Sequence, residues 1–177
     1  MTASRSQKIG LALGGGGARG LAHIGVLKVL EREKIPIHCI SGTSMGGLLG
    51  ALFAMGVPVA EIEKEIQRVV RVRELVKLLD IGISQGGALR GRRMYRYIAE
   101  RLGAERTFAE LPTPLGVVTV DLYSGKEVVI KEGRVVDAVR ATISLPGVFA
   151  PVELDQYRLI DGGVLNNVPV DVARSLG

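Results

Sequence analysis

The fold is decided by Ile35-Pro-Ile-His-Cys-Ile-Ser-Gly42-Thr43-Ser44-Met45-Gly46-Gly-Leu-Leu-Gly-Ala-Leu-Phe-Ala-Met55. The apolar run that ends at Ser41 is short and follows a proline, which is typical of a buried strand. Residues 48–55 are apolar nearly all round, as expected of a fully buried helix. Between them, residues 42–46 supply the glycines of a sharp turn. The stretch therefore predicts a strand, a tight turn and a buried helix, with Ser44 at the corner.

The same order of elements precedes this stretch. Residues 8–14 form a short apolar run that predicts a strand, and glycines 14–17 end it. From Leu21 onward, Ile24, Leu27 and Leu30 recur at helical spacing. Alternating strands and helices predict parallel strands joined by helical crossovers, which is an α/β fold. The rest of the chain predicts a helix after Pro58, a loop within 78–89, a helix at 90–102, hairpin strands at 115–120 and 127–131, a helix at 135–143, a strand at 158–160 and a helix from Asn167.

Length and composition indicate one globular domain. The chain has 177 residues, of which 47% are hydrophobic and 23% charged, and this suits one domain with a substantial core. We expect a flexible tail over residues 1–7 and one domain over 8–177. That domain ends at Gly177, where an α/β fold normally adds another strand, so we expect it to be truncated at its C-terminus.

Cellular location is indicated by three features. No signal peptide and no run of about 20 apolar residues is visible, so we expect no membrane span. Cys39 is the only cysteine, which excludes an internal disulfide, and its apolar surroundings predict a buried side chain. These features favour the reducing cytoplasm.

The chain is basic, with a formal net charge of +5. Much of the excess lies between Lys64 and Arg106. No aromatic residues or nucleic-acid motifs are interleaved with these charges, so we expect solvated helix faces rather than a nucleic-acid interface. Contact with a membrane surface is the functional alternative.

Chemistry is indicated by the turn itself. Gly42-Thr43-Ser44-Met45-Gly46 matches the pattern G-x-S-x-G, and a strand before it with a helix after it is the context that a nucleophile elbow requires. The serine hydroxyl would stand exposed at the helix N-terminus, which favours developing negative charge. The alternative is a structural strand-to-helix turn without catalytic function.

A base for Ser44 has few candidates. The sequence has two histidines, His23 and His38, and both precede the serine, so the order serine, acid, histidine is impossible. His38 is six residues upstream on the predicted strand, roughly 20 Å from the turn. A structural role is favoured for His23, with a catalytic role as the alternative. Asp121 and Asp161 both lie at strand ends, and Asp161 is favoured because two glycines follow it where catalytic groups of α/β folds cluster.

A second glycine cluster joins the first predicted strand to the first helix. Residues 14–20 read Gly-Gly-Gly-Gly-Ala-Arg-Gly, and their unshielded backbone N–H groups can form an anion-binding concavity. Beside a nucleophile, that concavity would be an oxyanion hole, to which the Met45 N–H could add a donor. A dinucleotide fingerprint over Gly15, Gly17 and Gly20 is the alternative. That fingerprint requires an acidic residue about 20 positions further along the chain. Residues 40–42 occupy that place in this sequence, and none of them is acidic.

Taken together, these segments resemble the patatin-like phospholipase family. The resemblance rests on five ordered segments: Gly15-Gly-Gly-Ala-Arg-Gly20, Gly42-Thr-Ser-Met-Gly46, Thr119-Val-Asp-Leu122 with Ser124-Gly125, residues 141–151, and Asp161-Gly-Gly163 with Asn167 and Pro169. It implies a three-layer α/β/α fold with a mostly parallel central sheet.

The resemblance also implies an activity and roles for residues. The activity is lipid acyl hydrolysis without metal or cofactor, as a phospholipase A, lysophospholipase or carboxylesterase, with transient contact at the inner face of the membrane and no nucleic acid. Ser44 and Asp161 would form a catalytic dyad. The oxyanion site would use Gly15, Gly16, Gly17 and Met45, supported by Arg19 and Gly20. The alternatives are a non-catalytic, lipid-binding regulatory module and, less favoured, a nucleotide-binding α/β protein.

Overall fold

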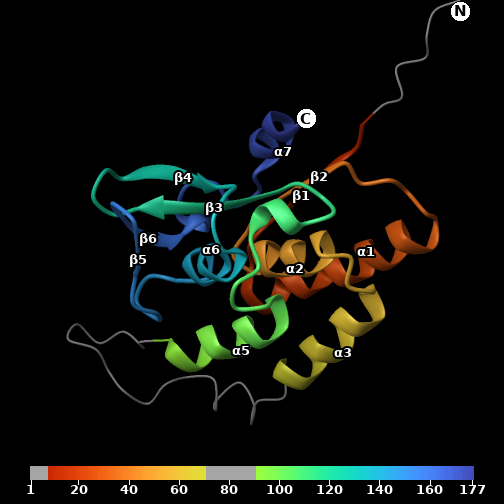
Figure 1. Ribbon diagram of the computed structural model, residues 1–177, viewed down its shortest axis with the longest axis horizontal. Helices are drawn as coiled ribbons and strands as arrows, with labels where there is room; N and C mark the ends of the chain where they lie inside the picture. The colour runs from red at the N-terminus through yellow and green to blue at the C-terminus, as the bar shows by residue number, and fades with distance from the viewer. Residues whose placement is uncertain (1–7, 71–90) are drawn as a thin grey trace, which may run out of the picture.

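A mixed six-stranded β-sheet organises the chain in the computed structural model, which describes residues 8–70 and 91–177 (Figure 1). The sheet is built from β1 (Gly10–Leu13), β2 (Cys39–Thr43), β3 (Leu115–Asp121), β4 (Lys126–Ile130), β5 (Val152–Leu154) and β6 (Tyr157–Asp161). The helices are α1 (Ala22–Arg32), α2 (Met45–Ala54), α3 (Val59–Val70), α5 (Arg92–Leu102), α6 (Val135–Thr142) and α7 (Val170–Leu176). Short 3-10 turns η1 (Gly17–Leu21), η2 (Phe108–Glu110) and η3 (Gly162–Val164) complete the described chain.

The sheet combines a parallel part with antiparallel additions. β1, β2 and β3 are adjacent and parallel, while β4 and β6 both pair antiparallel with β3, and β5 pairs antiparallel with β6. Among the described strands, β1, β2, β3 and β5 therefore run in one direction. This is the predicted α/β fold with a mostly parallel sheet.

Strand β3 brings two distant parts of the chain together. β4 pairs along one edge of β3 from Val117 to Asp121. A strand has two edges, so β2 and β6 share the other: β2 pairs as far as Val118, and β6 pairs from Thr119 onward. Because β2 is parallel to β3 and β6 antiparallel, the carboxyl ends of β2 and β6 meet at consecutive residues of β3.

Helices cover both faces of the sheet. In Figure 1, α2 and α6 lie against one face, with α1, α3 and α5 outside them, and α7 lies on the other. The side chains of β2 alternate accordingly. Ile40 and Gly42 face α2, whereas Cys39, Ser41 and Thr43 each donate a hydrogen bond to a carbonyl in α7 or in the segment before it. The predicted three-layer arrangement and the predicted burial of Cys39 are confirmed.

Most predicted elements are present with boundaries shifted by a few residues. β2 begins at Cys39 rather than near Ile35, and α2 begins directly after Ser44. The predicted hairpin around Ser124-Gly125 is confirmed by β3 and β4. β5 and the antiparallel course of β6 were not expected from the alternation of elements. The tail predicted over residues 1–7 and the loop predicted within 78–89 lie outside the described residues.

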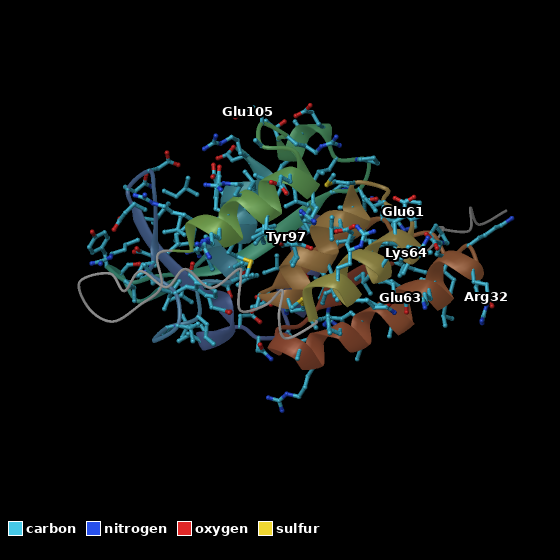
Figure 2. All side chains as sticks on the ribbon, turned by 90° about the horizontal axis from the view of Figure 1, so that it is seen from below. Arg32, Glu61, Glu63, Lys64, Tyr97 and Glu105 are labelled. Atoms are coloured by element: carbon cyan, nitrogen blue, oxygen red, sulfur yellow. The ribbon has the colours of Figure 1, made fainter. Side chains whose placement is uncertain are left out.

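Charged side chains lie on the outer helices. Glu61, Glu63 and Lys64 project from α3, and Arg32 from the end of α1 (Figure 2). Lys28 of α1 pairs with Glu63 at 2.6 Å. The basic residues Lys64 and Arg68 of α3 and Arg92, Arg93 and Arg96 of α5 are exposed, as expected, while Arg71, Arg73 and Arg90 lie outside the described residues.

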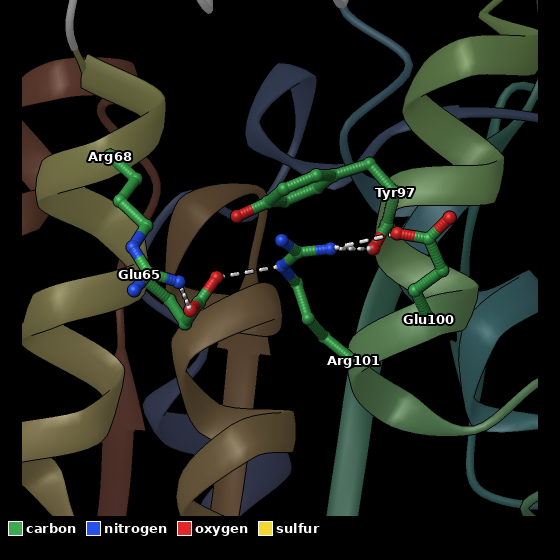
Figure 3. A network of polar contacts seen from close by, with 5 residues as sticks. All are labelled: Glu65, Arg68, Tyr97, Glu100 and Arg101. Atoms are coloured by element: carbon green, nitrogen blue, oxygen red, sulfur yellow. Dashed lines mark hydrogen bonds and ion pairs between the residues drawn. The ribbon is translucent and has the colours of Figure 1, made fainter.

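An ion-pair network joins α3 to α5 (Figure 3). Arg101 Nε donates to Glu65 Oε2 at 3.0 Å, and its guanidinium stacks over the Tyr97 ring at 3.5 Å. Glu65 also pairs with Arg68, and Arg101 with Glu100. The two outer helices are thereby held side by side.

Candidate active site

Ser44 occupies a strained turn between β2 and α2. Its backbone has φ 54° and ψ −122°, a conformation that residues with a side chain rarely adopt. The turn is tight because the glycines around it allow backbone to approach backbone. A Cβ on Gly42 would lie 2.6 Å from the Gly46 carbonyl oxygen, and a Cβ on Gly46 would overlap the carbonyl of Leu13. The strand-turn-helix predicted from the sequence is therefore a sharp elbow with the serine at its corner.

The Ser44 hydroxyl faces the Asp161 carboxylate directly. Ser44 Oγ donates to Asp161 Oδ2 at 2.7 Å, although 117 residues separate the two in sequence. Asp161 is only 3% exposed, and its Oδ1 accepts the Gly163 N–H at 2.8 Å. This second bond orients the carboxylate, so that one oxygen is held by the backbone and the other points to the serine. The meeting of β2 and β6 on β3 explains why these two side chains come together.

The other sequence candidates for a base have structural partners. His23 Nε2 lies 2.8 Å from the Gly14 carbonyl, which can only accept, so the ring donates and fastens the glycine loop. His38 Nδ1 accepts the Ile9 N–H at 3.0 Å. Neither ring contacts Ser44 by hydrogen bond, which agrees with the structural role favoured for His23.

Asp121 stabilises the β3–β4 turn. Its carboxylate accepts hydrogen bonds from the Ser124 hydroxyl and N–H and from the N–H groups of Tyr123 and Arg158. The Ser124 hydroxyl, followed by the Arg158 N–H, lowers the pKa of Asp121 from 3.8 to about 2. A carboxylate that is so fully engaged is a poor base, and Asp161 remains as the acid beside the serine.

The glycine loop before η1 packs against the elbow. A Cβ on Gly15 would lie 3.1 Å from the Ser44 Cβ, so the missing side chain is what lets the loop reach the serine. The Gly15 N–H donates to the Asn167 carbonyl at 3.0 Å and is thereby occupied. Gly16 and Gly17 follow with φ of 156° and 52°, in the region that favours glycine.

Free donors gather at this loop and at the elbow. Within residues 8–70 and 91–177, no acceptor bonds the backbone N–H of Gly16, of Gly17 or of Met45. Gly20 touches the elbow, since a Cβ there would lie 2.8 Å from the Met45 Cβ. Arg19 supports the loop through its backbone, whose N–H donates to the Gly16 carbonyl at 3.0 Å, while its side chain is exposed.

The residues that accept hydrogen bonds from the backbone N–H groups of Ser44 and Asp161 were not identified from the sequence. Thr142 Oγ1 accepts the Ser44 N–H at 2.8 Å and donates to the Val118 carbonyl at 2.5 Å. The Ser144 carbonyl accepts the Asp161 N–H at 3.0 Å. Both lie in the segment 141–151, whose resemblance to the family was a sign of its importance without indicating these contacts.

Exposed apolar residues follow directly on both site segments. Leu145 and Val148 come after Ser144, and Val164 and Leu165 come after Gly163. These residues are 50%, 37%, 55% and 56% exposed, respectively. We call these four residues the apolar rim.

The described residues contain neither a cluster of metal ligands nor a helix that could span a membrane. Over the described ranges, no group of three histidine, cysteine or acidic side chains is placed to hold a metal ion. In the same part of the chain, no helix combines the length and the hydrophobicity needed to cross a bilayer.

The fold and this arrangement define a class of protein. It is a three-layer α/β/α protein with a glycine loop, a serine elbow and an adjacent acid at the carboxyl ends of β1, β2 and β6. The sequence profile of the family described as "Patatin-like phospholipase" matches residues 11–174. The chain belongs to the patatin-like phospholipase family.

Individual relatives are consistent with this assignment. An uncharacterized NTE family protein of Mycobacterium tuberculosis is 38% identical over 169 residues, which cover 94% of this chain and 46% of the relative. The human patatin-like phospholipase domain-containing protein 6 is 36% identical over 179 residues, or 96% of this chain and 12% of the relative. The chain thus spans less than half the length of these relatives.

A solved structure shows the same fold. The crystal structure of VipD from Legionella pneumophila superposes with a TM-score of 0.63 at 16% sequence identity. The superposition covers 96% of this chain and 52% of VipD. The α/β architecture is therefore shared at a level of sequence identity where only the fold can be inferred.

Proposed function

We propose that this chain is a serine lipid acyl hydrolase that uses Ser44 and Asp161 as a catalytic dyad. The observation that carries the proposal is the direct hydrogen bond of 2.7 Å between Ser44 Oγ and the buried Asp161 carboxylate. A hydroxyl needs an adjacent base to become a nucleophile, and this carboxylate is placed to take its proton. Membership of the patatin-like phospholipase family supports an ester of a fatty acid as the substrate.

The proposed reaction has two halves. Ser44 Oγ attacks the carbonyl carbon of the acyl ester while its proton passes to Asp161 Oδ2. The tetrahedral intermediate then collapses, the ester bond breaks, and the leaving alcohol takes the proton from Asp161. Water next gives a proton to Asp161 and attacks the acyl-enzyme, and Ser44 regains its proton as the fatty acid leaves.

The developing negative charge would meet backbone N–H donors of the elbow and of the glycine loop that packs against it. The N–H groups of Gly16 and Gly17 in the glycine loop, with the Met45 N–H that follows the nucleophile, form the proposed oxyanion site. Gly15 is not included, because its N–H already donates to the Asn167 carbonyl. The N-terminus of α2 begins at Met45 and adds a favourable dipole. A single donor of this kind typically contributes about 3–4 kcal/mol to the transition state.

A lipid substrate is also supported by the apolar rim. Leu145 and Val164 directly follow Ser144 and Gly163, which bond Asp161 through their backbones. Val148 and Leu165 lie a few residues further on and are also exposed. Such side chains suit acyl chains or the surface of a bilayer, and burial of apolar area would favour transient contact with a membrane. The substrate class that we propose includes phospholipids, lysophospholipids and simple carboxylic esters.

Ester hydrolysis by matched serine variants tests the proposal. Turnover of p-nitrophenyl esters of graded acyl length is measured for the wild type, Ser44→Ala and Ser175→Ala. Ser175 lies in α7 and donates to the Val172 carbonyl, so its variant controls for loss of a serine hydroxyl away from the site. We expect Ser44→Ala to abolish turnover and labelling by a fluorophosphonate probe, with Ser175→Ala unaffected.

Two outcomes would redirect the proposal. Unchanged turnover in folded Ser44→Ala protein would remove the nucleophile from its role. Absence of labelling and turnover in the folded wild type, combined with binding to phosphatidylglycerol vesicles, would favour the alternative of a non-catalytic lipid-binding module.

A further inference from the structure

Thr142 is the last residue of α6. Its side chain contacts the backbone N–H of Ser44 and not the Ser44 hydroxyl. Its side chain is fully buried, and its hydroxyl takes part in two hydrogen bonds. Oγ1 accepts the Ser44 N–H at 2.8 Å and donates to the Val118 carbonyl at 2.5 Å. The threonine therefore links the strained residue of the elbow to the central strand of the sheet.

The direction of this link is fixed. A hydroxyl has one hydrogen, and the Val118 carbonyl can only accept, so the hydrogen of Thr142 must point to Val118. A lone pair is then directed at the Ser44 N–H. Val118 is also the residue of β3 at which the pairing with β2 ends, immediately before the pairing with β6 begins.

The Ser44 backbone needs such a support. A non-glycine residue with φ of 54° and ψ of −122° is held in a conformation that persists only where its surroundings over-determine it. The glycines around the turn permit this conformation by leaving space, but they do not hold it. The hydrogen bond to Thr142 is a directional contact that acts on the nucleophile's own N–H.

The same helix end also supports the acid. Two residues beyond Thr142, the Ser144 carbonyl accepts the Asp161 N–H at 3.0 Å. Ser144 is itself fixed, because Arg140 Nη1 donates to its hydroxyl at 2.6 Å and that hydroxyl donates to the Arg140 carbonyl at 3.0 Å. One rigid turn at the end of α6 thus contacts the backbone of both members of the pair.

We propose that Thr142 is a positioning residue, which sets the distance and direction between the Ser44 hydroxyl and the Asp161 carboxylate. This inference rests on the proposed function of that pair. Loss of the Thr142 hydroxyl releases the Ser44 N–H and lets the elbow relax, while the groups that would meet the substrate stay in place. The chemical step is therefore affected, and substrate binding is not.

The experiment compares Thr142→Val, Thr142→Ser and Thr107→Val. Valine keeps the shape of threonine without its hydroxyl, whereas serine keeps the hydroxyl. Thr107 provides the control, since its hydroxyl donates to Glu110 Oε2 at 2.7 Å in the turn η2 before the amino end of β3, whereas the elbow lies toward the carboxyl end of that strand. We expect Thr142→Val to lower kcat by about 10²-fold at unchanged KM, as misplacement of a reacting group by about 1 Å does.

The controls separate positioning from stability. Thr142→Ser should restore most of the lost kcat, and Thr107→Val, which loses the capping bond of η2, should lower the melting temperature while keeping kcat. The rate of fluorophosphonate labelling should fall with kcat in Thr142→Val, because it reports the nucleophile alone. If the valine variant fails to fold, Thr142→Ala serves instead, since it leaves room for water to bridge the two freed groups, and it should also show a reduced kcat.

The outcomes distinguish this inference from the function on which it rests. Wild-type kcat in folded Thr142→Val, or in folded Thr142→Ala where that variant replaces it, with Ser44→Ala inactive, would overturn the positioning role alone. Equal loss of kcat in Thr142→Val and Thr107→Val would show a general effect of lost stability and would also overturn it. Retained turnover in Ser44→Ala would instead remove the proposed function, and the inference with it.

Discussion

Alanine in place of Gly46 tests whether the elbow depends on backbone-to-backbone packing. Gly46 is the second residue of α2, and it lies against the carboxyl end of β1. A Cβ at this position would overlap the Leu13 carbonyl oxygen and lie 2.5 Å from the Leu13 carbonyl carbon and 2.7 Å from the Gly14 oxygen. All three atoms belong to the backbone, so no side chain can rotate to make room. Either α2 or the end of β1 must move.

The size of the effect follows from two opposed contributions. Overpacking of a core typically costs about 1–3 kcal/mol, and a collision with rigid backbone belongs at the upper end, about 3 kcal/mol. Replacement of glycine by alanine restricts the unfolded chain and offsets about 0.4–1 kcal/mol of this. The net loss is about 2 kcal/mol. For a domain of this size it corresponds to a melting temperature lower by roughly 4–8 °C.

Gly25→Ala provides the matched control. Gly25 lies within α1, and a Cβ there would meet nothing within 4 Å. Alanine should raise stability at this site by about 0.5–1 kcal/mol, because glycine is a poor helix former. Thermal unfolding followed by circular dichroism measures both variants, and ester turnover reports the displacement of Ser44 in Gly46→Ala. The reasoning is refuted if Gly46→Ala melts at or above the wild-type temperature, or if the two variants shift it equally.

Three further changes test other parts of the molecule. Asp161→Asn should keep the fold, measured by circular dichroism, and lower kcat by about 10²–10⁴-fold through loss of the base; wild-type turnover would contradict this. The folded-state pKa of Asp121 is lowered to about 2, so this carboxylate stabilises the fold fully above its unfolded-state pKa of 3.8 and loses that effect as the pH falls from about 4 to about 2. Asp121→Asn should therefore make the free energy of unfolding, measured in urea, fall less steeply over this pH range. An unchanged acid limb would show that this carboxylate is not responsible. Glu65→Gln should weaken the contact between α3 and α5 by less than about 1 kcal/mol, and the difference from wild type should shrink in 1 M salt if it arises from ion pairs with Arg101 and Arg68.

The elbow could be predicted because its requirements are local. The local features are a short apolar run, glycines at 42 and 46 and an apolar helix. Together they determine the order of the elements and the tightness of the turn. The glycine loop was recognised for the same reason. The local sequence does not distinguish the N–H groups of this loop from one another, however. The Gly15 N–H is already hydrogen-bonded because it meets the carbonyl of Asn167, which is more than 150 residues away in the sequence.

The course of β6 and the role of α6 could not be predicted in this way. Periodicity indicates that residues 158–160 form a strand, but it does not state which neighbour the strand pairs with or in which direction. Thr142 shows the same limit. In the sequence it is one threonine at the end of an amphipathic helix, and only the packing of α6 against β3 brings its hydroxyl to the Ser44 N–H. Long-range pairing therefore determines which local motifs become a site.

That pairing also explains why two residues can replace a triad in the proposed mechanism. β2 and β6 end against consecutive residues of one strand, Val118 and Thr119, so the serine and the aspartate emerge at direct hydrogen-bond distance. No space remains between them for an imidazole ring, and the two histidines are engaged elsewhere. A shared strand makes the geometry precise without a third side chain, but it also couples the two groups. A shift of β3 in this region would move nucleophile and base together, whereas loss of the Thr142 hydroxyl would move only one of them. Substitutions that disturb their relative position should therefore impair turnover more than those that displace the pair as a unit.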